Sequence, residues 1–514
     1  MFKLDPWTTA VQGALALQNF GRGTGAVRSF RLALFRAPSH RLSGSIRCQY
    51  YYYHRCRVGT ICVNSSSHPP QSLSRTTVFT ASKLASTLHP RYFSSLSTGY
   101  HHRQQQQVKM SSTITEGVRT AANPYKILIA GGCYAGLSAA INLLERCDTI
   151  ESPIPLDITI VDERDGFYHV IGSPLALSLK SYAEKAWVDY KDVKILQRPD
   201  VRFVHGTVSK VNCEAKRATI SERGSQEPRV QAYDYFITAT GLRRVWPVVP
   251  QSATRKEYLE EAGAHIDAVM KSTAPVLVVG GGAVGIEMAA ELKYVQPNVK
   301  VTLAHSRDKL LSAEPLPDMV KDCALEMTQQ AGVDVLLSHR LQSSTPVKGE
   351  DGADLYEVEF TNGHKMTASQ VIMAISKSIP STDFLPKEAL TEEGYVKVLA
   401  NMQFASPDVP NAESHFAVGD LIHWSGIKRC GAAMWEGKLA ALNIHQTMLQ
   451  TIKGKEPEFT ELSEIPPMIG LAVGKNAVSY GPEGMNSGPQ VMERFFENDL
   501  GFRIVWDHLR LGGA

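Results

Sequence analysis

Apolar runs, glycine turns and helical patterns follow one another in the same order at two places in the chain. The first begins with the apolar run YKILIA at 125–130 and continues through a glycine turn and a helical pattern at 135–146 to LDITIVD at 156–162. The same order starts again at 274, where APVLVVG leads through a helical pattern to VKVTLA. Strand, helix and strand make a βαβ unit, so the sequence predicts an α/β fold with parallel sheets.

The remaining sequence predicts mainly β structure and one long helix. β-Rich sequence fills 201–241 between the two units, and the pair Asn362-Gly363 is typical of a tight hairpin turn. A later apolar strand ends in Gly-Asp at 419–420, and a helical pattern follows from about Gly431. We therefore expect the chain to return to a parallel sheet after the second unit.

Both glycine turns resemble the pattern G-x-G-x-x-G, in which the backbone approaches a pyrophosphate at the start of a helix. The second turn is complete, with Gly280, Gly282 and Gly285. The first has Gly131 and Gly136, but Cys133 stands in place of the middle glycine. A thiol at a helix N-terminus can be reactive, whereas a buried cysteine more often packs as a small apolar residue. We favour the passive interpretation for Cys133.

Charge is distributed unevenly along the chain. Residues 1–110 hold 14 of the 54 basic residues and 1 of the 51 acidic ones, which leaves 40 basic and 50 acidic residues in 111–514, a balance of −10. The acid-poor, Arg- and Ser-rich leader predicts a disordered targeting segment for mitochondrial import, with RYFSS at 91–95 similar to a processing site. The alternative is translation from Met110, which would leave a cytoplasmic or membrane-associated protein. The acidic remainder argues against nucleic-acid binding.

Cysteine usage and hydropathy exclude several classes of protein. The eight cysteines show no C-x-x-C or Cys/His metal spacing, so we expect neither a disulfide framework nor a metal site. No apolar run reaches the roughly 18 to 20 residues that a membrane-spanning helix needs. The C-terminal sequence FRIVWDHLRL mixes aromatic, aliphatic and basic residues, so it either contacts a membrane surface or packs on the protein or a second subunit. We favour packing.

The order of motifs over about 124–450 resembles the two-dinucleotide flavoprotein reductases. Four motifs carry the resemblance: the first glycine turn with Asp162, TATG at 238–241, the second glycine turn, and AVGD at 417–420. It implies two Rossmann-like dinucleotide-binding domains, an FAD domain with an inserted NAD(P)H domain, and a small C-terminal segment. The expected divisions are a leader at 1–110, an FAD domain formed by 124–250 and 371–450, an NAD(P)H domain at 274–370 between them, and a C-terminal segment at 451–514.

Within this superfamily, the sequence is similar to the group of apoptosis-inducing-factor homologues and ferroptosis-suppressor-like proteins. VDERDGFYHVIGSPLAL, which contains His169 and Pro174, resembles the stretch that nears the flavin, and Lys428 matches a flavin-proximal lysine. The resemblance implies an FAD-dependent oxidoreductase that takes hydride from NAD(P)H and reduces a quinone-like acceptor. The sequence departs from the group at Cys133 and at AISKS (374–378), which replaces a second A-T-G-like turn.

The resemblance also assigns roles to individual residues. The expected catalytic residues are Lys428, which would stabilise the reduced flavin, and Glu287, beside the nicotinamide. The alternative for Lys428 is a solvated lysine. Asp162 is expected to bind the adenosine ribose, with Glu163 a weaker candidate. The expected FAD contacts are Gly131, Gly132, Cys133, Tyr134, Ala135, Gly136, Asp162, Pro174, Thr240, Gly241, Gly419 and Asp420. The expected NAD(P)H contacts are Gly280, Gly282, Gly285, His305 and Arg307.

The nicotinamide preference is read about 20 residues after the last glycine of the second turn. An acid there favours NADH because it repels a 2′-phosphate, but this chain has His305-Ser306-Arg307. Arginine can pair with a phosphate, so we expect NADPH to serve at least as well as NADH. The alternative is that Arg307 points into solvent and the enzyme accepts both.

Two other functions compete with a quinone reductase. One is a reductase of a small electron-transfer protein. The other is a redox-switched signalling protein, like apoptosis-inducing factor, whose basic surface would bind DNA; the acidic balance of 111–514 argues against it. Disulfide reductases of this architecture carry a cysteine pair close after the first unit, and here no cysteine lies between the isolated Cys147 and Cys213. We therefore expect electrons to leave without a dithiol step. A homodimer is also expected to be possible.

Overall fold

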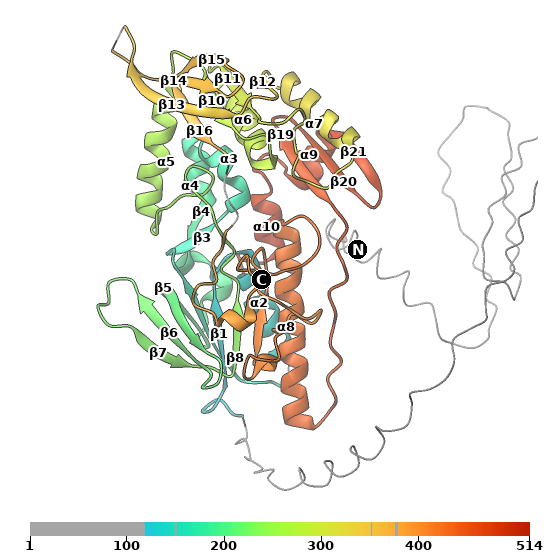
Figure 1. Cartoon of the computed structure of the whole chain (residues 1–514). Coiled ribbons are helices and arrows are strands. Elements are labelled where there is room, and N and C mark those ends of the chain that lie inside the picture. The colour runs from blue at the N-terminus through green and yellow to red at the C-terminus, as the bar shows by residue number, and fades with distance from the viewer. Residues whose placement is uncertain (1–118, 150–151, 351, 376–378, 514) are drawn as a thin grey trace, which may run out of the picture. The chain divides into compact units, whose positions relative to one another are not determined.

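The computed structural model describes residues 119–149, 152–350, 352–375 and 379–513. The predicted leader, its processing sequence and Met110 lie outside these residues. Among the described residues, no helix is long and apolar enough to cross a membrane. The mixed α/β architecture confirms the predicted fold class (Figure 1).

The first unit is built on a seven-stranded sheet, in which five parallel strands continue into an antiparallel meander. In spatial order the strands are β18 (His415–Ala417), β8 (Tyr235–Thr238), β1 (Tyr125–Ala130), β2 (Leu156–Asp162), β5 (Val201–Asn212), β6 (Arg217–Glu222) and β7 (Arg229–Ala232). Strands β1 and β2 have the bounds that the apolar runs predicted. β18, from far along the chain, pairs with β8 and brings the AVGD turn to the same sheet.

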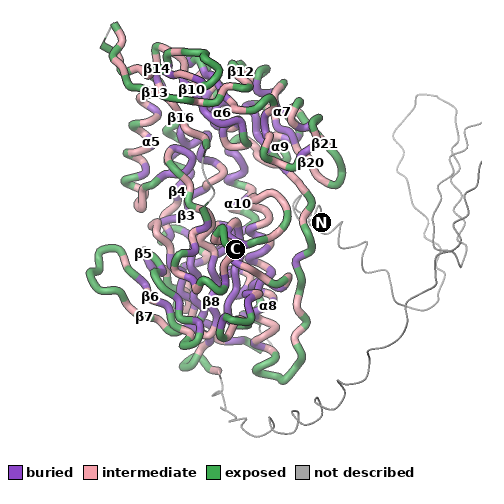
Figure 2. The backbone as a smooth tube through the Cα atoms, in the orientation of Figure 1, coloured by how far each residue is buried: buried purple, intermediate pink, exposed green. Residues whose placement is uncertain are grey.

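Two helices pack together on this sheet because apolar residues line their facing sides. They are α2 (Tyr134–Cys147) and α8 (Cys430–Lys453). The contact is close: a Cβ on Gly437 would overlap the Ala135 carbonyl oxygen, and the Ser138 hydroxyl donates to the Met434 carbonyl at 2.6 Å. The sheet and both helices form one buried core, which Figure 2 shows as buried tube around β1 and β8.

The second unit contains a four-stranded parallel sheet with a small antiparallel sheet beside it. The parallel strands are β12 (Asp334–Leu336), β11 (Val301–Ala304), β10 (Val276–Val279) and β16 (Gln370–Met373), and the antiparallel ones are β13 (Leu341–Lys348), β14 (Asp354–Phe360) and β15 (Lys365–Ala368). The helices of this unit are α6 (Ala283–Val295) and α7 (Asp318–Gln330). The predicted hairpin at Asn362-Gly363 joins β14 to β15, and Gly363 has φ +83°.

Several short elements and one longer helix, α5, lie along the chain outside the strands of the two parallel sheets. They are β3 (Gly166–Tyr168), α3 (Ser173–Ala176), α4 (Lys180–Ala186), β4 (Trp187–Asp189), β9 (Leu242–Arg243), α5 (Arg255–Met270) and β17 (Ile379–Pro380). Single 3-10 turns lie at Val170–Gly172, Tyr190–Asp192, Lys194–Leu196, Lys387–Ala389 and Ala412–Ser414. β9 pairs with β17, so the chain after TATG lies beside the chain that returns from the second unit.

The C-terminal segment forms a three-stranded sheet and two short helices. These are β19 (Ile469–Val473), β20 (Asn476–Gly481), β21 (Gly484–Gly488), α9 (Pro489–Phe495) and α10 (Phe502–His508). Phe502, Val505 and Leu509 are buried in the core of the first unit, whereas Leu471 and Val473 are buried against the second. The apolar residues of the C-terminal sequence therefore pack largely inside the protein.

Candidate dinucleotide-binding sites

The first glycine turn can follow its path only because its glycines lack a Cβ. Gly131 has φ +103°, and a Cβ on it would overlap the Ala239 carbonyl oxygen. A Cβ on Gly136 would overlap the Gly131 carbonyl oxygen. Both positions bring backbones into direct contact, which side chains would prevent. The turn thus packs tightly against TATG, where Thr240 and Gly241 follow β8.

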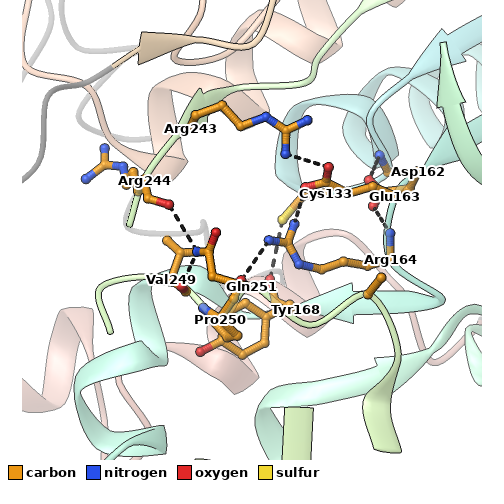
Figure 3. A network of polar contacts seen from close by, with 12 residues as sticks. Cys133, Asp162, Glu163, Arg164, Tyr168, Arg243, Arg244, Val249, Pro250 and Gln251 are labelled. Carbon is orange, nitrogen blue, oxygen red and sulfur yellow. Dashed lines mark hydrogen bonds and ion pairs between the residues drawn. The ribbon is translucent and has the colours of Figure 1, made fainter. Parts of the chain in front are cut away.

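Cys133 is the N-cap residue of α2, and its side chain caps no helix N–H. The thiol instead donates to the Tyr168 carbonyl at 3.5 Å (Figure 3). Burial raises the pKa of the Cys133 thiol to about 12, and the Asp162 carboxylate adds to this effect. A thiol that stays protonated is a poor nucleophile, which supports the passive interpretation.

Asp162 ends β2 beside the glycine turn. Its carboxylate accepts the Gly132 N–H at 2.6 Å and the Arg164 N–H at 2.8 Å, and burial raises its pKa. Glu163 instead faces arginines, with Arg243 at 2.5 Å and Arg164 at 3.5 Å. The two adjacent acids therefore face different partners, and Asp162 is the one directed at the turn (Figure 3).

The AVGD turn lies beside the same helix. Gly419 has φ +89°, and Asp420 forms an ion pair with Arg244 at 3.7 Å. Burial raises the pKa of Asp420, whereas the Arg244 and Lys428 charges lower it. Arg244 follows TATG, so this pair joins two of the motifs. The expectation from sequence alone missed Arg244, although the pair Arg243-Arg244 begins two residues after Gly241 and is a visible signal.

Lys428 lies close to this turn but does not point freely into solvent. Its ammonium donates to the Ile422 carbonyl at 2.7 Å and lies 5.9 Å from the centre of the Tyr395 ring. Burial lowers its pKa, while Glu436 and Asp420 raise it. Its proposed role in stabilising a reduced flavin stays a prediction.

Glu436 is a second residue that the sequence did not identify. It is buried on α8, and its carboxyl accepts the Gly419 N–H at 2.7 Å. Burial raises the pKa of Glu436 to about 8. The sequence did carry a signal for this residue, because Glu436 is the single acid within the apolar stretch AAMWEGKLAAL. An acid on a buried helix face needs a polar partner, which here is the Gly419 N–H.

His169 belongs to a chain of contacts that reaches the C-terminal segment. It is completely buried, its Nε2 donates to the Leu500 carbonyl at 3.0 Å, and its Nδ1 lies 3.3 Å from the Tyr134 hydroxyl. The carbonyl can only accept, so the ring proton lies on Nε2 and Tyr134 donates to Nδ1. Burial lowers the pKa of His169 to about 4, so the ring stays neutral. Pro174, five residues on, is buried in α3.

The second glycine turn repeats the backbone arrangement of the first. Gly280 has φ +125°, and a Cβ on it would lie 2.7 Å from the Ala374 carbonyl oxygen. A Cβ on Gly285 would overlap the Gly280 carbonyl oxygen. Gly282 is the N-cap of α6 and offers no capping side chain. A Cβ on Gly282 would meet no atom within 4 Å, so the space in front of this helix is open.

His305 follows β11 and is held on both sides of its ring. Nδ1 accepts the Gly281 N–H at 3.0 Å, and Nε2 lies 2.9 Å from the Ser312 hydroxyl. Because Nδ1 accepts, the neutral ring carries its proton on Nε2. Burial and the nearby Arg307 charge lower the pKa of His305, which favours this neutral form. The Arg307 residue is exposed.

Glu287 faces the C-terminal segment. Its carboxyl accepts the Ala472 N–H of β19 at 3.3 Å, and burial raises its pKa to about 8. Glu291, one turn later on α6, is buried, and one of its carboxyl oxygens has no partner among the described residues. The place of Glu287 beside a nicotinamide stays a prediction.

The residues of the first unit fit an FAD molecule. The N-terminus of α2 has no side-chain cap, and Gly131 and Gly136 of the turn leave no room for a Cβ, an arrangement that suits a pyrophosphate. Asp162 ends the adjacent strand, where an acid suits ribose hydroxyls. In the described portion of the chain, the buried Nε of Arg164 and the hydroxyl of Thr238 have no partner. Such unpaired polar atoms are expected where a polar cofactor belongs.

The described residues contain no cluster of three or more His, Cys, Asp or Glu that could hold a metal ion. The chain forms two dinucleotide-binding units, and after the second unit it returns to the sheet of the first through β18. This arrangement defines a flavoprotein oxidoreductase that uses a pyridine nucleotide. The sequence pattern of the pyridine nucleotide-disulphide oxidoreductase family matches residues 125–437, and the chain belongs to this family.

Two curated relatives resemble this chain over most of its folded region. Oxidoreductase OXR1 of Ajellomyces capsulatus is 44% identical over 436 residues, which cover 80% of this chain and 94% of that protein. Ferroptosis suppressor protein 1 of Homo sapiens is 24% identical over 330 residues, covering 63% of this chain and 81% of that protein. These relatives confirm the resemblance seen in the motifs.

Solved structures confirm the fold. An NAD-dependent persulfide reductase from A. fulgidus superposes with a TM-score of 0.54 at 19% identity, over 69% of this chain and 63% of that one. The water-forming NADH oxidase from Lactobacillus brevis superposes with a TM-score of 0.51 at 16% identity, over 69% of this chain and 74% of that one. The chain thus spans under two thirds of the first of these proteins, and identities this low concern the fold alone.

Proposed function

We propose that this protein is an FAD-dependent NAD(P)H oxidoreductase that reduces a quinone-like acceptor without a redox-active disulfide. One observation carries the proposal: in each of the two units a helix starts without a side-chain cap, two glycines of the turn leave no room for a Cβ, and a polar side chain at the end of the next strand accepts a backbone N–H of that turn. The likeness to ferroptosis suppressor protein 1 supports the quinone-like acceptor.

The chain's own residues would bind and orient the two cofactors. The first turn and Asp162 would hold FAD, and the second turn and His305 would hold the nicotinamide nucleotide. Bound FAD supplies the chemistry that accepts a hydride and passes on two electrons. The protein contributes proximity and orientation, for which no nucleophilic side chain is needed.

The cysteines support a route without a dithiol. Cys133, Cys147, Cys213, Cys323 and Cys430, the cysteines of the described residues, are all free thiols. Burial raises the pKa of Cys133 and of Cys430 to about 12, so neither would form a thiolate readily at neutral pH. Direct transfer from the flavin to a small acceptor is therefore the simplest route.

We further propose that NADPH serves at least as well as NADH. A neutral His305 stands at the end of the second strand, where an acid would repel a 2′-phosphate. The exposed Arg307 guanidinium can approach such a phosphate.

A steady-state screen of quinones, dyes and oxygen with both nicotinamides tests the proposed function. We expect rapid reduction of quinones and dyes with NADPH. Turnover with none of them, or turnover that alkylating all thiols abolishes, would contradict it.

Mitochondrial delivery remains a proposal for residues 1–110. Sequencing the N-terminus of the endogenous protein is expected to find a start near Ser94. An intact Met1, or a cytosolic protein that begins at Met110 or Ser111, would contradict import.

Peripheral membrane contact and a homodimer also remain proposals. Flotation with liposomes, with and without residues 451–514, tests the membrane contact, and sedimentation at several protein concentrations tests the homodimer.

A further inference from the structure

A hollow of about 650 Å³ lies on the first unit, against the outer strands β5, β6 and β7 of the seven-stranded sheet (Figure 1). Lys126 and Asp157, which line it, are the second residues of the parallel strands β1 and β2. Nucleotides bind at the carboxyl ends of such strands, so these two residues lie at the opposite strand ends from Asp162. None of the residues that line the hollow belongs to the expected FAD or NAD(P)H contacts.

The polar side chains of this hollow hold one another in place. The buried Thr159 hydroxyl accepts a hydrogen bond from Arg202 at 3.2 Å and another from Gln231 at 2.8 Å. The Gln231 side-chain oxygen in turn accepts from Arg229 at 2.5 Å. These contacts cross β2, β5 and β7, so both guanidinium groups are positioned before any ligand binds, which lowers the entropic cost of binding.

Three groups in the hollow keep donors that the protein does not use. Arg202 bonds only through Nη2, which also pairs with Asp157 at 3.4 Å. Arg229 bonds through Nε, to Glu222, and through Nη1. In the part of the chain that the structure describes, Nε and Nη1 of Arg202, Nη2 of Arg229 and the Lys126 ammonium have no partner. Guanidinium and ammonium groups only donate, so a ligand in this hollow must supply acceptors.

The charges of the hollow favour an anionic ligand. Four basic residues line it against the two acids Asp157 and Glu222, namely Lys126, Arg202, Arg223 and Arg229. Arg223 is also paired at 2.8 Å with Glu257 of α5, which does not line the hollow. The positive charge of Lys126 therefore has no carboxylate to balance it. An ammonium beside two guanidinium groups with free donors suits a phosphate group, which arginine can bind through two parallel hydrogen bonds.

The hollow has room for more than a phosphate group. Sites for small molecules typically have volumes of roughly 300–1,000 Å³. Apolar side chains also line this hollow, among them Val204, Ala232 and Val230, and Val230 is 61% exposed. A phosphate ester of an apolar or aromatic group therefore fits the hollow better than an inorganic ion does.

We propose that this hollow is a binding site for a phosphomonoester, whose phosphate is bound by Lys126, Arg202 and Arg229. The ester can be a soluble small molecule or a lipid headgroup, because the recognising chemistry is the same. The inference concerns residues outside both cofactor sites and does not depend on the proposed function.

Ligand-observed phosphorus NMR of the full-length protein with phenyl phosphate tests the soluble source, in the presence of saturating NADP⁺ to occupy the second glycine turn. Lys126→Gln removes a charge without removing any contact within the protein. It should weaken binding about tenfold, as expected for the loss of one charge-assisted hydrogen bond. Arg202→Gln should weaken binding at least as much. The matched control is Lys210→Gln, because Lys210 is an exposed lysine of β5 that does not line the hollow, and it should bind like the wild type.

Flotation with phosphatidylcholine vesicles, with and without phosphatidic acid, tests the lipid source. Flotation that requires phosphatidic acid and is weakened by Lys126→Gln but not by Lys210→Gln would assign the site to a headgroup. Binding of neither phenyl phosphate nor phosphatidic acid would overturn the inference. Binding that is unchanged in Lys126→Gln and Arg202→Gln, or reduced equally in Lys210→Gln, would overturn it as well. The flavin content of the same samples separates the two proposals, since a protein without flavin would contradict the proposed function and leave the phosphate titration valid.

Discussion

In each glycine turn a backbone N–H donates to a side chain at the end of the next strand, and the geometry is the same in both units. The two side chains, Asp162 and His305, differ in charge. In the first unit the Asp162 carboxylate accepts the Gly132 N–H at 2.6 Å. In the second unit His305 Nδ1 accepts the Gly281 N–H at 3.0 Å. An acid in the first position suits ribose hydroxyls, whereas a neutral imidazole in the second tolerates a 2′-phosphate. The same backbone geometry can thus suit two different nucleotides, depending on which side chain stands at this position.

The largest expected effect comes from removing the acid of the first unit. Asp162→Ala deletes the acceptor for two backbone N–H groups and the expected ribose contact. Hydrogen bonds to a charged group contribute about 1.5–3 kcal/mol each, so FAD affinity should fall roughly 100-fold. The ratio of flavin to protein absorbance after gel filtration measures this. Glu163→Gln is the control and should keep its flavin; equal flavin content in both variants would contradict the assignment of Asp162.

Placing an acid in the second unit should change the nicotinamide preference. His305→Asp reproduces at Gly281 the arrangement of Asp162 at Gly132, and it should repel a 2′-phosphate. We expect the ratio of kcat/KM for NADPH to that for NADH to fall about tenfold, which corresponds to about 1.4 kcal/mol. Arg307→Ala should raise KM for NADPH selectively by a smaller factor. An unchanged ratio in both variants would show that this loop does not read the phosphate.

The two acids of α6, Glu287 and Glu291, should make stability depend on pH. Burial raises the pKa of Glu287 and Glu291 to about 8, so the folded protein keeps protons that the unfolded chain releases. The free energy of unfolding should therefore fall as pH rises from about 4.5 to about 8. Glu291→Gln should flatten this dependence by roughly 1–3 kcal/mol, measured by denaturant unfolding at several pH values. A dependence as steep as in the wild type would argue against a buried, protonated Glu291.

The smallest effect is expected at Cys133. Cys133→Gly restores the usual glycine and should leave FAD content and turnover within about twofold, because the thiol stays protonated. Alkylation rates near neutral pH should likewise be slow for this residue. Loss of turnover with flavin retained would instead show that the thiol takes part in catalysis.

Much of the fold could be predicted because its signals are local. The bounds of β1 and β2 follow from apolar runs, and the start of α8 was placed within one residue by its helical pattern. The resemblance preferred Asp162 to Glu163, and strand alternation explains why the two adjacent side chains face different partners.

Contacts between distant regions of the chain could not be predicted in this way. Glu287 meets Ala472, and His169 meets Leu500, across separations of 185 and 331 residues. No pattern within one segment encodes such a partner, because it depends on how the C-terminal segment folds back. The burial of Glu436 could not be predicted for the same reason, because it depends on α2 and the AVGD turn covering α8.

The central claim is that the first unit holds FAD and the second delivers electrons to it from NAD(P)H. Anaerobic mixing of the purified full-length protein with NADPH, followed by a quinone, tests this most directly. The flavin absorbance should bleach with NADPH and return with the quinone, while the number of free thiols stays constant. A protein without flavin, or a bound flavin that neither nicotinamide bleaches, would contradict the account.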